Sequence, residues 1–353
     1  MPVWFLSILL LIVWEEMPWA FAQPQPSVGL QFSSGQATLS LTGAVGTVYS
    51  IQYTSGLSST NLWVDRTLLL AQPASNVWTD PTAPSTAQRF YRAVSVAAPA
   101  DTNLVFIQPG TFTMGSPTNE SGHVFKETQH LVTISRGFWM GKYLVTQGDY
   151  LAVTGIHQSY FTSAKGYSDD PTRPVETTSW SGATNYCALR TRQERAAGLV
   201  STNCVYRLPT ESEWEFACRA ATTTAFYLGD SIQSGQANFD GRHEYDAVLG
   251  TISNPSGIFL GMTSPVGIYA PNPWGLYDMI GDVWEWCRDW YGNYPGGSVI
   301  DPQGPDSGSF RVLRGGGWDY YATNCRAAKR FSILPEEGDF DIGLRVVLAQ
   351  GEP

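Results

Sequence analysis

Short alternations of apolar and polar residues mark the N-terminal part of the chain. Four runs show the pattern, at Ala37–Leu41, Tyr49–Tyr53, Val77–Thr79 and Arg89–Val94. Gly, Ser, Asn and Pro separate these runs at short intervals. Because successive side chains of a strand point to opposite faces, the pattern predicts half-buried strands joined by tight turns. We therefore expect residues 27–97 to form a small all-β sandwich of the immunoglobulin or fibronectin kind, followed by a linker at 97–101.

The pattern changes beyond Thr102, where three helices are predicted from residues that cap helix N-termini. The caps and their helices are Thr146 for a helix to about Thr154, Ser179 or Ser181 for one to about Ala196, and Thr210 for Glu211–Ala220. Loops and short strands fill most of the remaining chain. Residues 103–349 are therefore predicted to form a second domain of the α+β class.

An apolar run at the start of the chain resembles an export signal. Val3–Val13 is nearly free of polar residues, and the small-residue site Ala20-Phe21-Ala22 follows it, although no Lys or Arg precedes it. The run is too short to span a bilayer. We expect residues 1–22 to be a signal peptide cut after Ala22. The mature protein is then expected to be secreted, periplasmic or at the cell surface, with no membrane segment.

Composition narrows the class of protein and of partner. The chain has 353 residues, 43% of them hydrophobic and only 15% charged, which excludes an intrinsically disordered protein. The formal net charge of −10 argues against a nucleic-acid partner held by phosphate contacts. We expect a two-domain protein that is a monomer.

Five cysteines lie in the second domain, at positions 187, 204, 218, 287 and 325. An odd count leaves at least one thiol unpaired, and neither a CxxC motif nor a Cys/His cluster points to structural zinc. Cys187 and Cys204 flank the link between the second and third predicted helices, which favours a local bridge between them. Cys287 is predicted to be a buried, unreactive thiol.

Four motifs in the second domain carry the most specific information. They are Arg207–Arg219 (RLPTESEWEFACR), Gly275–Trp286 (GLYDMIGDVWEW), Arg314–Trp318 (RGGGW) and Ile342–Val346 (IGLRV). In this order they resemble the formylglycine-generating enzyme family, also called the sulfatase-modifying factor family. The resemblance covers about Asn103–Leu348. It implies a variant of the C-type lectin fold with little regular secondary structure.

The resemblance also implies an activity, from which this chain departs. Family enzymes use molecular oxygen to oxidise a cysteine of an unfolded sulfatase segment to formylglycine. They use two cysteines five residues apart, whose soft thiolates bind copper(I). Here Tyr320 stands at the first position. Cys325, five residues on, lies in a segment that resembles the part of the family with a structural cysteine. One thiolate cannot form a two-coordinate site, so the sequence argues against copper(I) and leaves enzymatic activity open.

Family resemblance suggests two further features of the second domain. Cys218 and Cys325 are expected to form a disulfide, which would contribute about 4 kcal/mol by closing a long loop. Calcium is expected at positions equivalent to the family's sites, because carboxylate and carbonyl oxygens suit this ion. The expected ligands are Asp278, Gly281, Val283 and Glu285 at one site, and Asn238 and Phe239 at another. The alternative is that Asp278 caps a turn and Glu285 pairs with an arginine such as Arg314.

Three functions are compatible with these residues. The first is an exported family member without the oxidase, which binds an extended peptide, a sulfatase or a glycan in a groove lined by Trp318, Asp319, Tyr320 and Tyr321. The second is an active formylglycine-generating oxidase with a rearranged site that uses Cys325. The third is a structural surface or adhesion protein. Tyr and Trp are frequent in recognition surfaces, which favours the first function.

Overall fold

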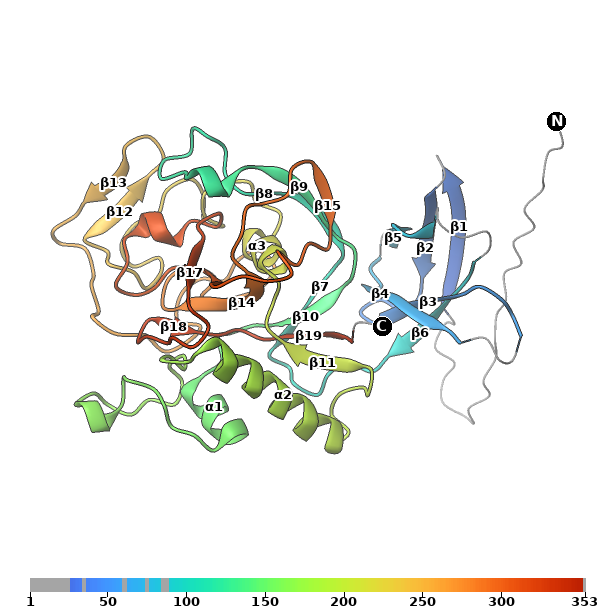
Figure 1. Ribbon diagram of the computed structural model, residues 1–353, viewed down its shortest axis with the longest axis horizontal. Helices are drawn as coiled ribbons and strands as arrows, with labels where there is room; N and C mark the ends of the chain where they lie inside the picture. The colour runs from blue at the N-terminus through green and yellow to red at the C-terminus, as the bar shows by residue number, and fades with distance from the viewer. Residues whose placement is uncertain (1–25, 34–35, 59–61, 74–75, 84–88, 352–353) are drawn as a thin grey trace.

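The computed structural model describes residues 26–33, 36–58, 62–73, 76–83 and 89–351 (Figure 1). The predicted signal peptide, residues 1–22, lies outside this range. Six strands gather at one end of the molecule, and the three helices and the remaining strands form a larger body beside them.

The six N-terminal strands form two antiparallel sheets of three strands each. One sheet contains β1 (Ser27–Ser33), β2 (Gln36–Thr42) and β5 (Asn76–Asp80), and the other β4 (Val64–Leu70), β3 (Val48–Thr54) and β6 (Phe90–Val96). Leu39, Ile51, Leu69 and Trp78 belong to the core between them. The four alternating runs of the sequence lie in or overlap β2, β3, β5 and β6. β4 does not alternate, and the alternation of β1 was overlooked.

The three helices begin where their capping residues predict. They are α1 (Gln147–Thr154), α2 (Trp180–Ala196) and α3 (Glu211–Arg219). Thr146 and Thr210 each form a capping box with the residue three positions on, and Ser179, not Ser181, caps α2. In such a box the hydroxyl and the carboxylate each accept a hydrogen bond from an amide that the helix itself leaves unpaired.

The described part of the second domain contains four sheets, with α1 and α2 along one side of them (Figure 1). The first two are β11 (Cys204–Arg207), β19 (Val347–Gln350), β10 (Phe138–Gly141) and β7 (Leu104–Ile107), and β15 (Ser298–Ile300), β9 (His130–Ile134) and β8 (Gly110–Met114). The others are β17 (Phe331–Ile333), β16 (Arg311–Arg314), β14 (Trp284–Trp290) and β18 (Ile342–Gly343), and the pair β12 (His243–Asp246) and β13 (Gly250–Ser253). The strands are short, and long loops join them.

Buried arginines hold these loops where strand ladders are absent. Arg314 is fully buried; it pairs with Glu215 and donates to the carbonyls of Ala328 and Lys329 at 3.0 and 2.7 Å. Arg326 likewise pairs with Glu127 at 2.9 Å. Buried carbonyls must find donors, and a guanidinium offers five N–H groups in a fixed plane. Paired arginines therefore satisfy backbone that regular secondary structure leaves unbonded.

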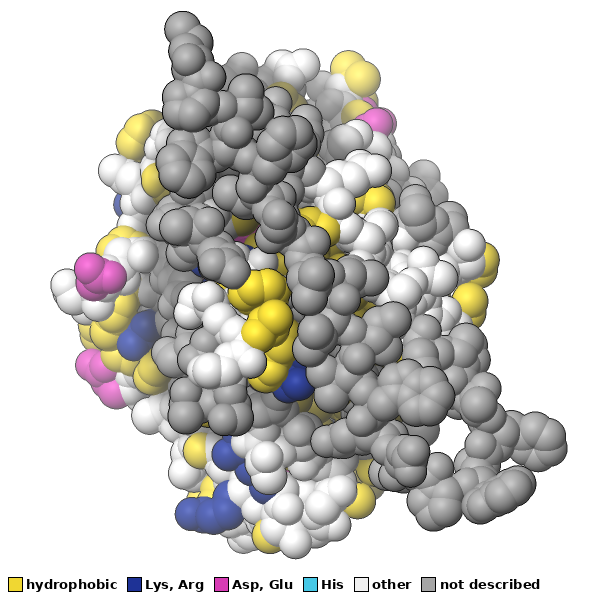
Figure 2. All heavy atoms as spheres, turned by 90° about the vertical axis from the view of Figure 1, so that its right-hand side faces the viewer, with side chains coloured by type: hydrophobic (Ala, Val, Ile, Leu, Met, Phe, Trp, Pro, Cys, Tyr) yellow, Lys and Arg dark blue, Asp and Glu magenta, His cyan; other side chains and the backbone are white. Residues whose placement is uncertain are grey.

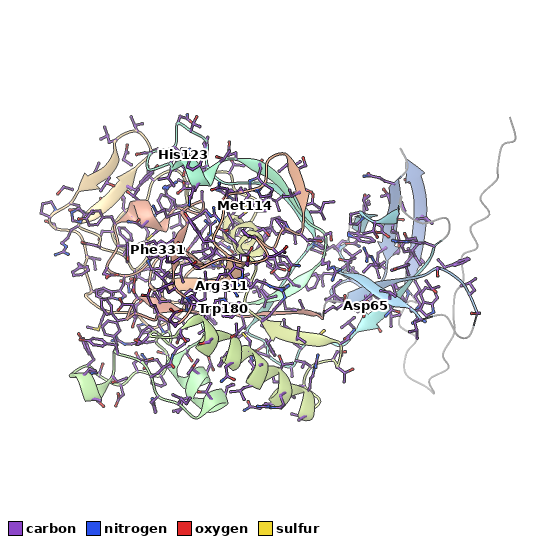
Figure 3. The ribbon with its side chains drawn as sticks, viewed as in Figure 1. Asp65, Met114, His123, Trp180, Arg311 and Phe331 are labelled. Atoms are coloured by element: carbon purple, nitrogen blue, oxygen red, sulfur yellow. The ribbon has the colours of Figure 1, made fainter. Side chains whose placement is uncertain are left out.

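The sandwich is fixed against the second domain by direct hydrogen bonds. The indole N–H of Trp78 donates to the carbonyl of Ser135 at 2.9 Å. The side-chain amide of Gln108 bonds both backbone groups of Leu70, with distances of 2.6 and 3.2 Å. Asp65, labelled in Figure 3, accepts from the amide of Asn203 at 3.0 Å. Because the contacts involve several strands, the two domains hold one relative orientation in this structure.

Figure 2 views the molecule from the sandwich end. Among the described side chains on this face, most are hydrophobic or uncharged, and Lys and Arg gather mainly toward the lower left. No helix in the described ranges is long and apolar enough to cross a membrane.

A buried carboxyl at the start of α3 predicts a pH-dependent stability. Asp289 accepts the amide of Glu211 at 2.8 Å, and burial, with the Glu211 carboxylate, raises the pKa of Asp289 from 3.8 to about 8. The folded protein therefore keeps a proton that the unfolded chain releases above about pH 4, so the free energy of unfolding falls as the pH rises from about 4 to about 8. Asp289→Asn has no such proton to lose. We expect its unfolding free energy, relative to that of the unmodified protein, to rise across this window.

Urea unfolding of both proteins at about pH 5 and about pH 8 measures this effect. If the difference in unfolding free energy between the two proteins were the same at both pH values, the prediction would be contradicted.

Candidate functional site

Trp318 lies at the centre of an aromatic cluster formed with Phe161, Phe259 and Phe340. Its ring centroid is 5.6, 5.9 and 5.6 Å from theirs, respectively. Its indole N–H donates to the carbonyl of Phe340 at 3.3 Å, and only 9% of the residue is exposed. Trp318, predicted to line a groove, is thus largely enclosed by this cluster and supports the surface from below.

The three residues after Trp318 differ in how far they reach solvent. Tyr321 is 44% exposed and stacks on His243 with a centroid distance of 3.8 Å. Tyr320 is half-buried against the edge of Trp284, and burial raises its pKa to about 12. One carboxylate oxygen of Asp319 is buried and has no hydrogen-bond partner. The predicted residues therefore form one continuous stretch, of which Tyr321 is the most accessible part.

Two further carboxylates lie beside this stretch. Burial, and then the charges of Asp319 and Asp339, raise the pKa of Asp341 to about 7. Burial also raises the pKa of Asp319. A carboxyl that titrates near neutral pH can hold or release a proton there. The sequence analysis missed Asp339 and Asp341, because they follow Trp318 by about twenty residues and belong to no motif that signals acid–base chemistry.

Cys325 lies in the hydrophobic core beneath the glycines of the RGGGW motif. It is fully buried at the end of a short 3-10 helix, Ala322–Cys325. A Cβ atom on Gly316 would lie 2.6 Å from its sulfur. Burial raises the pKa of the Cys325 thiol to about 12, so the thiol stays protonated at neutral pH. A protonated, enclosed thiol is neither a nucleophile nor a metal ligand.

The predicted disulfides are wrong, because all five cysteines are free and buried in the structure. The Cys218 thiol donates instead to the carbonyl of Met279 at 3.6 Å, and the Cys204 thiol points to the Asn203 side chain at 3.7 Å. Cys187 and Cys204 share one hydrophobic core, and Cys218, Cys287 and Cys325 share the other. The thiols act as small apolar side chains that fill these cores.

The loop from Asp278 to Asp282 gathers oxygen atoms that have no hydrogen-bond partner. Asp278 accepts from the amide of Gly267 at 2.6 Å, and Asp282 accepts from the Asn238 side chain at 2.8 Å. The second oxygen of each carboxylate is buried and unpartnered, and so are the hydroxyls of Thr263 and Ser264. Burial raises the pKa of Asp278 to about 6, and burial with the Asp278 charge raises that of Asp282 to about 7.

Glu285, expected as a calcium ligand, is already fully bonded. Its two oxygens accept from Arg345 at 2.9 and 3.0 Å, and one also accepts from the Trp214 indole at 2.9 Å. Glu285 thus pairs with an arginine, although the partner is Arg345 and not Arg314. Phe239 packs in the hydrophobic core. Within the described part of the chain, no three His, Cys, Asp or Glu side chains gather as a metal cluster.

Asp282, Thr263 and Ser264 are the residues near this loop that the sequence analysis missed. Asp282 lies inside the GLYDMIGDVWEW motif, between the expected calcium ligands Gly281 and Val283. Its position in the sequence could therefore have identified it. The two hydroxyl residues precede the motif by about eleven positions and carry no pattern of their own. Ser264 reaches the site because its amide donates to Asp282 at 2.9 Å.

Comparisons with known proteins agree with the motifs. The formylglycine-generating enzyme of Streptomyces coelicolor is 37% identical over 187 residues, which cover 50% of this chain and 52% of that protein. A Chlamydia caviae protein named serine/threonine-protein kinase pkn1 is 30% identical over 271 residues, covering 70% of this chain and 38% of that one. The chain thus spans only about 40 to 50% of the length of these two curated relatives.

A solved structure shows the same fold. Treponema denticola variable protein 1 superposes with a TM-score of 0.55 at 26% identity, covering 70% of this chain and 95% of that one. This agrees with the expected C-type-lectin-like α+β fold of few helices and short mixed sheets. The family profile "Sulfatase-modifying factor enzyme 1-like domain" matches residues 92–350, well over half of the sequence. The chain therefore belongs to the sulfatase-modifying factor family, which includes the formylglycine-generating enzymes.

Proposed function

We propose that this protein is an exported member of the family that lacks cysteine-to-formylglycine oxidase activity and binds a peptide or a glycan. The state of Cys325 carries the first part of the proposal. It is the one cysteine of its segment, it is fully buried, and its pKa is about 12. Tyr320 occupies the position of the partner cysteine and supplies no sulfur.

The residues present do not fit the copper(I) ion of the family enzymes. Copper(I) needs two soft thiolates that face each other. Here Cys325 faces Gly316, and burial keeps its proton in place. The structure therefore gives no basis for an oxidative step at a copper ion.

The surface at Asp319–Tyr321 supports the binding part of the proposal. Tyr321 and the neighbouring Phe259 are 44% and 38% exposed, so two aromatic rings are open to a ligand. Arg242 lies over the Phe259 ring at 4.1 Å. Aromatic rings with adjacent charged groups suit extended peptides and sugars, since a ring gives contact area at little entropic cost. A sulfatase segment is one such peptide.

Export is proposed from the N-terminal residues alone. The apolar run Val3–Val13 and the site Ala20-Phe21-Ala22 have the order of a signal peptide. Expression of the full chain, followed by N-terminal sequencing of secreted material, tests this. Export predicts a mature chain that begins at Gln23, and retention of an uncut chain in the cell contradicts it.

Mass spectrometry of a sulfatase-type peptide tests the loss of the oxidase. A peptide with the pattern Cys-x-Pro-x-Arg is incubated with the protein, copper(I), reductant and oxygen. The Streptomyces coelicolor enzyme serves as the positive control. We expect no conversion of the peptide cysteine to an aldehyde by this protein while the control converts it. Conversion by this protein would refute the proposal.

The second candidate function, an active oxidase, is favoured by the relatives named formylglycine-generating enzyme. The same assay separates the two. An active oxidase further predicts that Cys325→Ala abolishes conversion, whereas the proposed binding protein has no activity for that substitution to remove.

Peptide binding is tested by calorimetry with the same peptide. Tyr321→Ala removes an exposed ring of the proposed surface, and Phe125→Ala removes a ring that is 75% exposed elsewhere. We expect only Tyr321→Ala to weaken binding, by about tenfold if the ring contributes about 1.4 kcal/mol. Equal affinities for both variants would place the ligand elsewhere, and no binding by the unmodified protein would shift the test to glycans.

We further propose that calcium binds between Asp278 and Asp282. Each of these two carboxylates has a buried oxygen without a partner. The Ser264 amide donates to Asp282 at 2.9 Å, which places the unpartnered Ser264 hydroxyl beside them. Calcium takes six to eight oxygens, and the carbonyls of Gly281 and Val283 are candidates for the rest. The ion would neutralise two carboxylates whose pKa values are raised by burial, and for Asp282 also by the charge of Asp278. Glu285 is not in this set, since Arg345 occupies it.

Calcium is therefore expected to raise the melting temperature of the protein. A ligand that binds only the folded state at about a hundred times its Kd adds about 2.7 kcal/mol. Scanning calorimetry with calcium and with a chelator measures the shift. Asp282→Asn should lose most of it, whereas Asp246→Asn, at the end of β12 and outside this loop, should keep it. An equal shift in both variants, or none in the unmodified protein, would contradict the site.

A further inference from the structure

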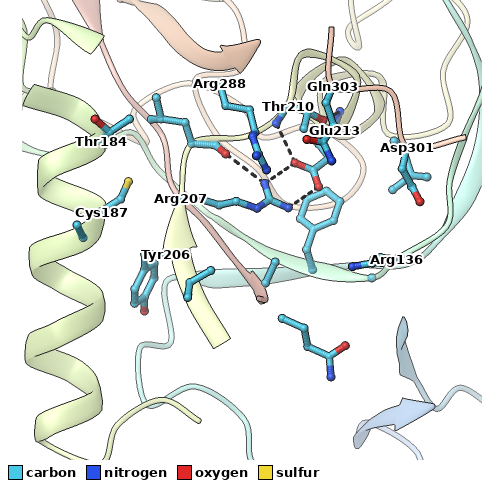
Figure 4. A pocket seen from close by; sticks show the side chains of 18 of the residues that line it. Arg136, Thr184, Cys187, Tyr206, Arg207, Thr210, Glu213, Arg288, Asp301 and Gln303 are labelled. Carbon is cyan, nitrogen blue, oxygen red and sulfur yellow. Dashed lines mark hydrogen bonds and ion pairs between the residues drawn. The ribbon is translucent and has the colours of Figure 1, made fainter. Parts of the chain in front are cut away.

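A cavity of about 650 Å³ lies where the sandwich meets the second domain, and we call it the junction pocket (Figure 4). It opens between α2, β11, the turn from β9 to β10, and the segments around Arg288 and Gln303. Its volume lies within the range of about 300–1,000 Å³ that small-molecule sites have. None of the four sequence motifs pointed to it as a site, and the Trp318 cluster does not contribute to its wall.

One part of the pocket wall is apolar and rigid. The half-buried side chains of Trp180 and Val205 line it, and the fully buried Phe138 and Leu208 lie behind them in the wall. The indole N–H of Trp180 donates to the carbonyl of Cys287 at 3.0 Å. The Arg311 guanidinium lies over the Trp180 ring at 3.8 Å, and Figure 3 shows the two residues side by side. A ring held in this way loses little freedom when a ligand packs on it.

The charged groups of the pocket leave one cation without a partner. Arg207 is paired with Glu213 through two bonds of 2.7 Å each. Asp301 is also in use, since it accepts from the amide of Ser135 at 2.7 Å and from its hydroxyl. Arg136 makes no hydrogen bond or ion pair with any residue that the structure describes. It stands across the pocket from Cys187 and Tyr206 (Figure 4).

The sandwich fixes the position of this wall. The amide of Gly137, next to Arg136, donates to the hydroxyl of Thr67 at 3.2 Å. A Cβ atom on Gly137 would collide with the carbonyl of Leu68, so glycine permits this close approach. The side chain of Gln350, on the same wall, donates to the hydroxyl of Ser50 at 3.0 Å. The first domain thus contacts the pocket wall at two places.

We propose that the junction pocket binds an apolar monocarboxylate, such as an aryl carboxylic acid. Its carboxylate would accept hydrogen bonds from Arg136, whose planar guanidinium matches a carboxylate in two parallel bonds. Its apolar body would lie on Trp180 and Val205, the partly exposed apolar side chains of the wall. A single unpaired guanidinium matches one negative charge, which favours a carboxylate over a doubly charged phosphate. The proposal is independent of the function proposed for the Trp318 region.

Calorimetric titration of the full chain with 2-naphthoate tests the proposal. Arg136→Gln keeps the length of the side chain but removes its charge, and it should weaken binding at least about tenfold, as expected for a hydrogen bond to a charged group. Arg192→Gln removes an exposed charge from α2 outside the pocket and should leave the affinity unchanged. The neutral analogue 2-naphthamide should bind the unmodified protein at least about tenfold more weakly than 2-naphthoate.

A second variant tests the pocket without changing its charge. Ala188 is an exposed residue of α2 that lines the pocket, so Ala188→Phe should fill the cavity without disturbing the core and abolish binding. Affinity for 2-naphthoate that Arg136→Gln and Ala188→Phe both leave unchanged overturns the proposal. Failure of the unmodified protein to bind 2-naphthoate at millimolar concentration overturns it as well.

Discussion

Arg345→Met is expected to lower the free energy of unfolding by about 3–5 kcal/mol, the usual cost of removing one partner of a buried ion pair. Arg345 is fully buried and bonds both oxygens of Glu285. It also donates to the carbonyls of Gly141 and Tyr277, each at 2.9 Å. The substitution leaves a buried carboxylate with only the Trp214 indole as donor and two carbonyls with no partner. Each of these groups would then be buried away from water without the hydrogen bond that offsets the free-energy cost of its desolvation.

Urea unfolding measures this effect against a surface control. Arg242 pairs with Asp240 at 2.7 Å, but its side chain is 46% exposed, so Arg242→Met should cost far less than Arg345→Met. The double variant Arg345→Met with Glu285→Gln removes the stranded charge and should recover part of the loss. If Arg345→Met destabilised the protein no more than Arg242→Met does, the buried pair would not have the structural role assigned to it.

Gly316→Ala is expected to destabilise the protein by about 2–5 kcal/mol, since two separate costs add. The φ angle of Gly316 is +83°, in the left-handed region, where an L-residue costs about 1–2 kcal/mol. The new Cβ would also lie 2.6 Å from the sulfur of Cys325 and 3.0 Å from the carbonyl oxygen of Asn324. Overpacking of this kind costs about 1–3 kcal/mol more.

Gly275→Ala is a matched control for the second cost. Gly275 has a φ angle of +84°, but nothing lies within 4 Å of the position of its Cβ atom. Its substitution should therefore carry only the backbone cost. Adding Cys325→Ala to Gly316→Ala opens space for the new methyl group and should restore part of the stability. Equal losses for the Gly316 and Gly275 variants in thermal unfolding would show that no clash occurs.

Local features of the sequence predicted local structure well. The helix caps at Thr146 and Thr210 depend on a hydroxyl and a carboxylate three residues apart, so a few neighbouring residues suffice to recognise them. The order of four long motifs was enough to indicate the family and its fold. The strand β4 was missed because VDRTLLL lacks a clean alternation of apolar and polar residues, whereas β1 was overlooked although SVGLQFS does alternate.

Long-range pairings could not be predicted in the same way. Glu285 was expected either to bind calcium or to pair with an arginine such as Arg314. Several arginines could pair with it, and the sequence does not show which one does. In the structure Arg345 forms an ion pair with Glu285, and Arg314 forms one with Glu215. The expected disulfides failed for the same reason, because a cysteine count says nothing about the direction in which each thiol points.

The sequence by itself determined that an all-β region precedes an α+β region, where the helices begin, and the family to which the second domain belongs. These depend on contacts within a few residues or on the order of whole motifs. Only the tertiary structure decided that Cys325 is enclosed, that oxygens of Asp278 and Asp282 lack partners, and that Arg136 stands unpaired in a pocket beside the sandwich. Each of these depends on distances and burial among segments far apart in the chain, and packing alone sets those quantities.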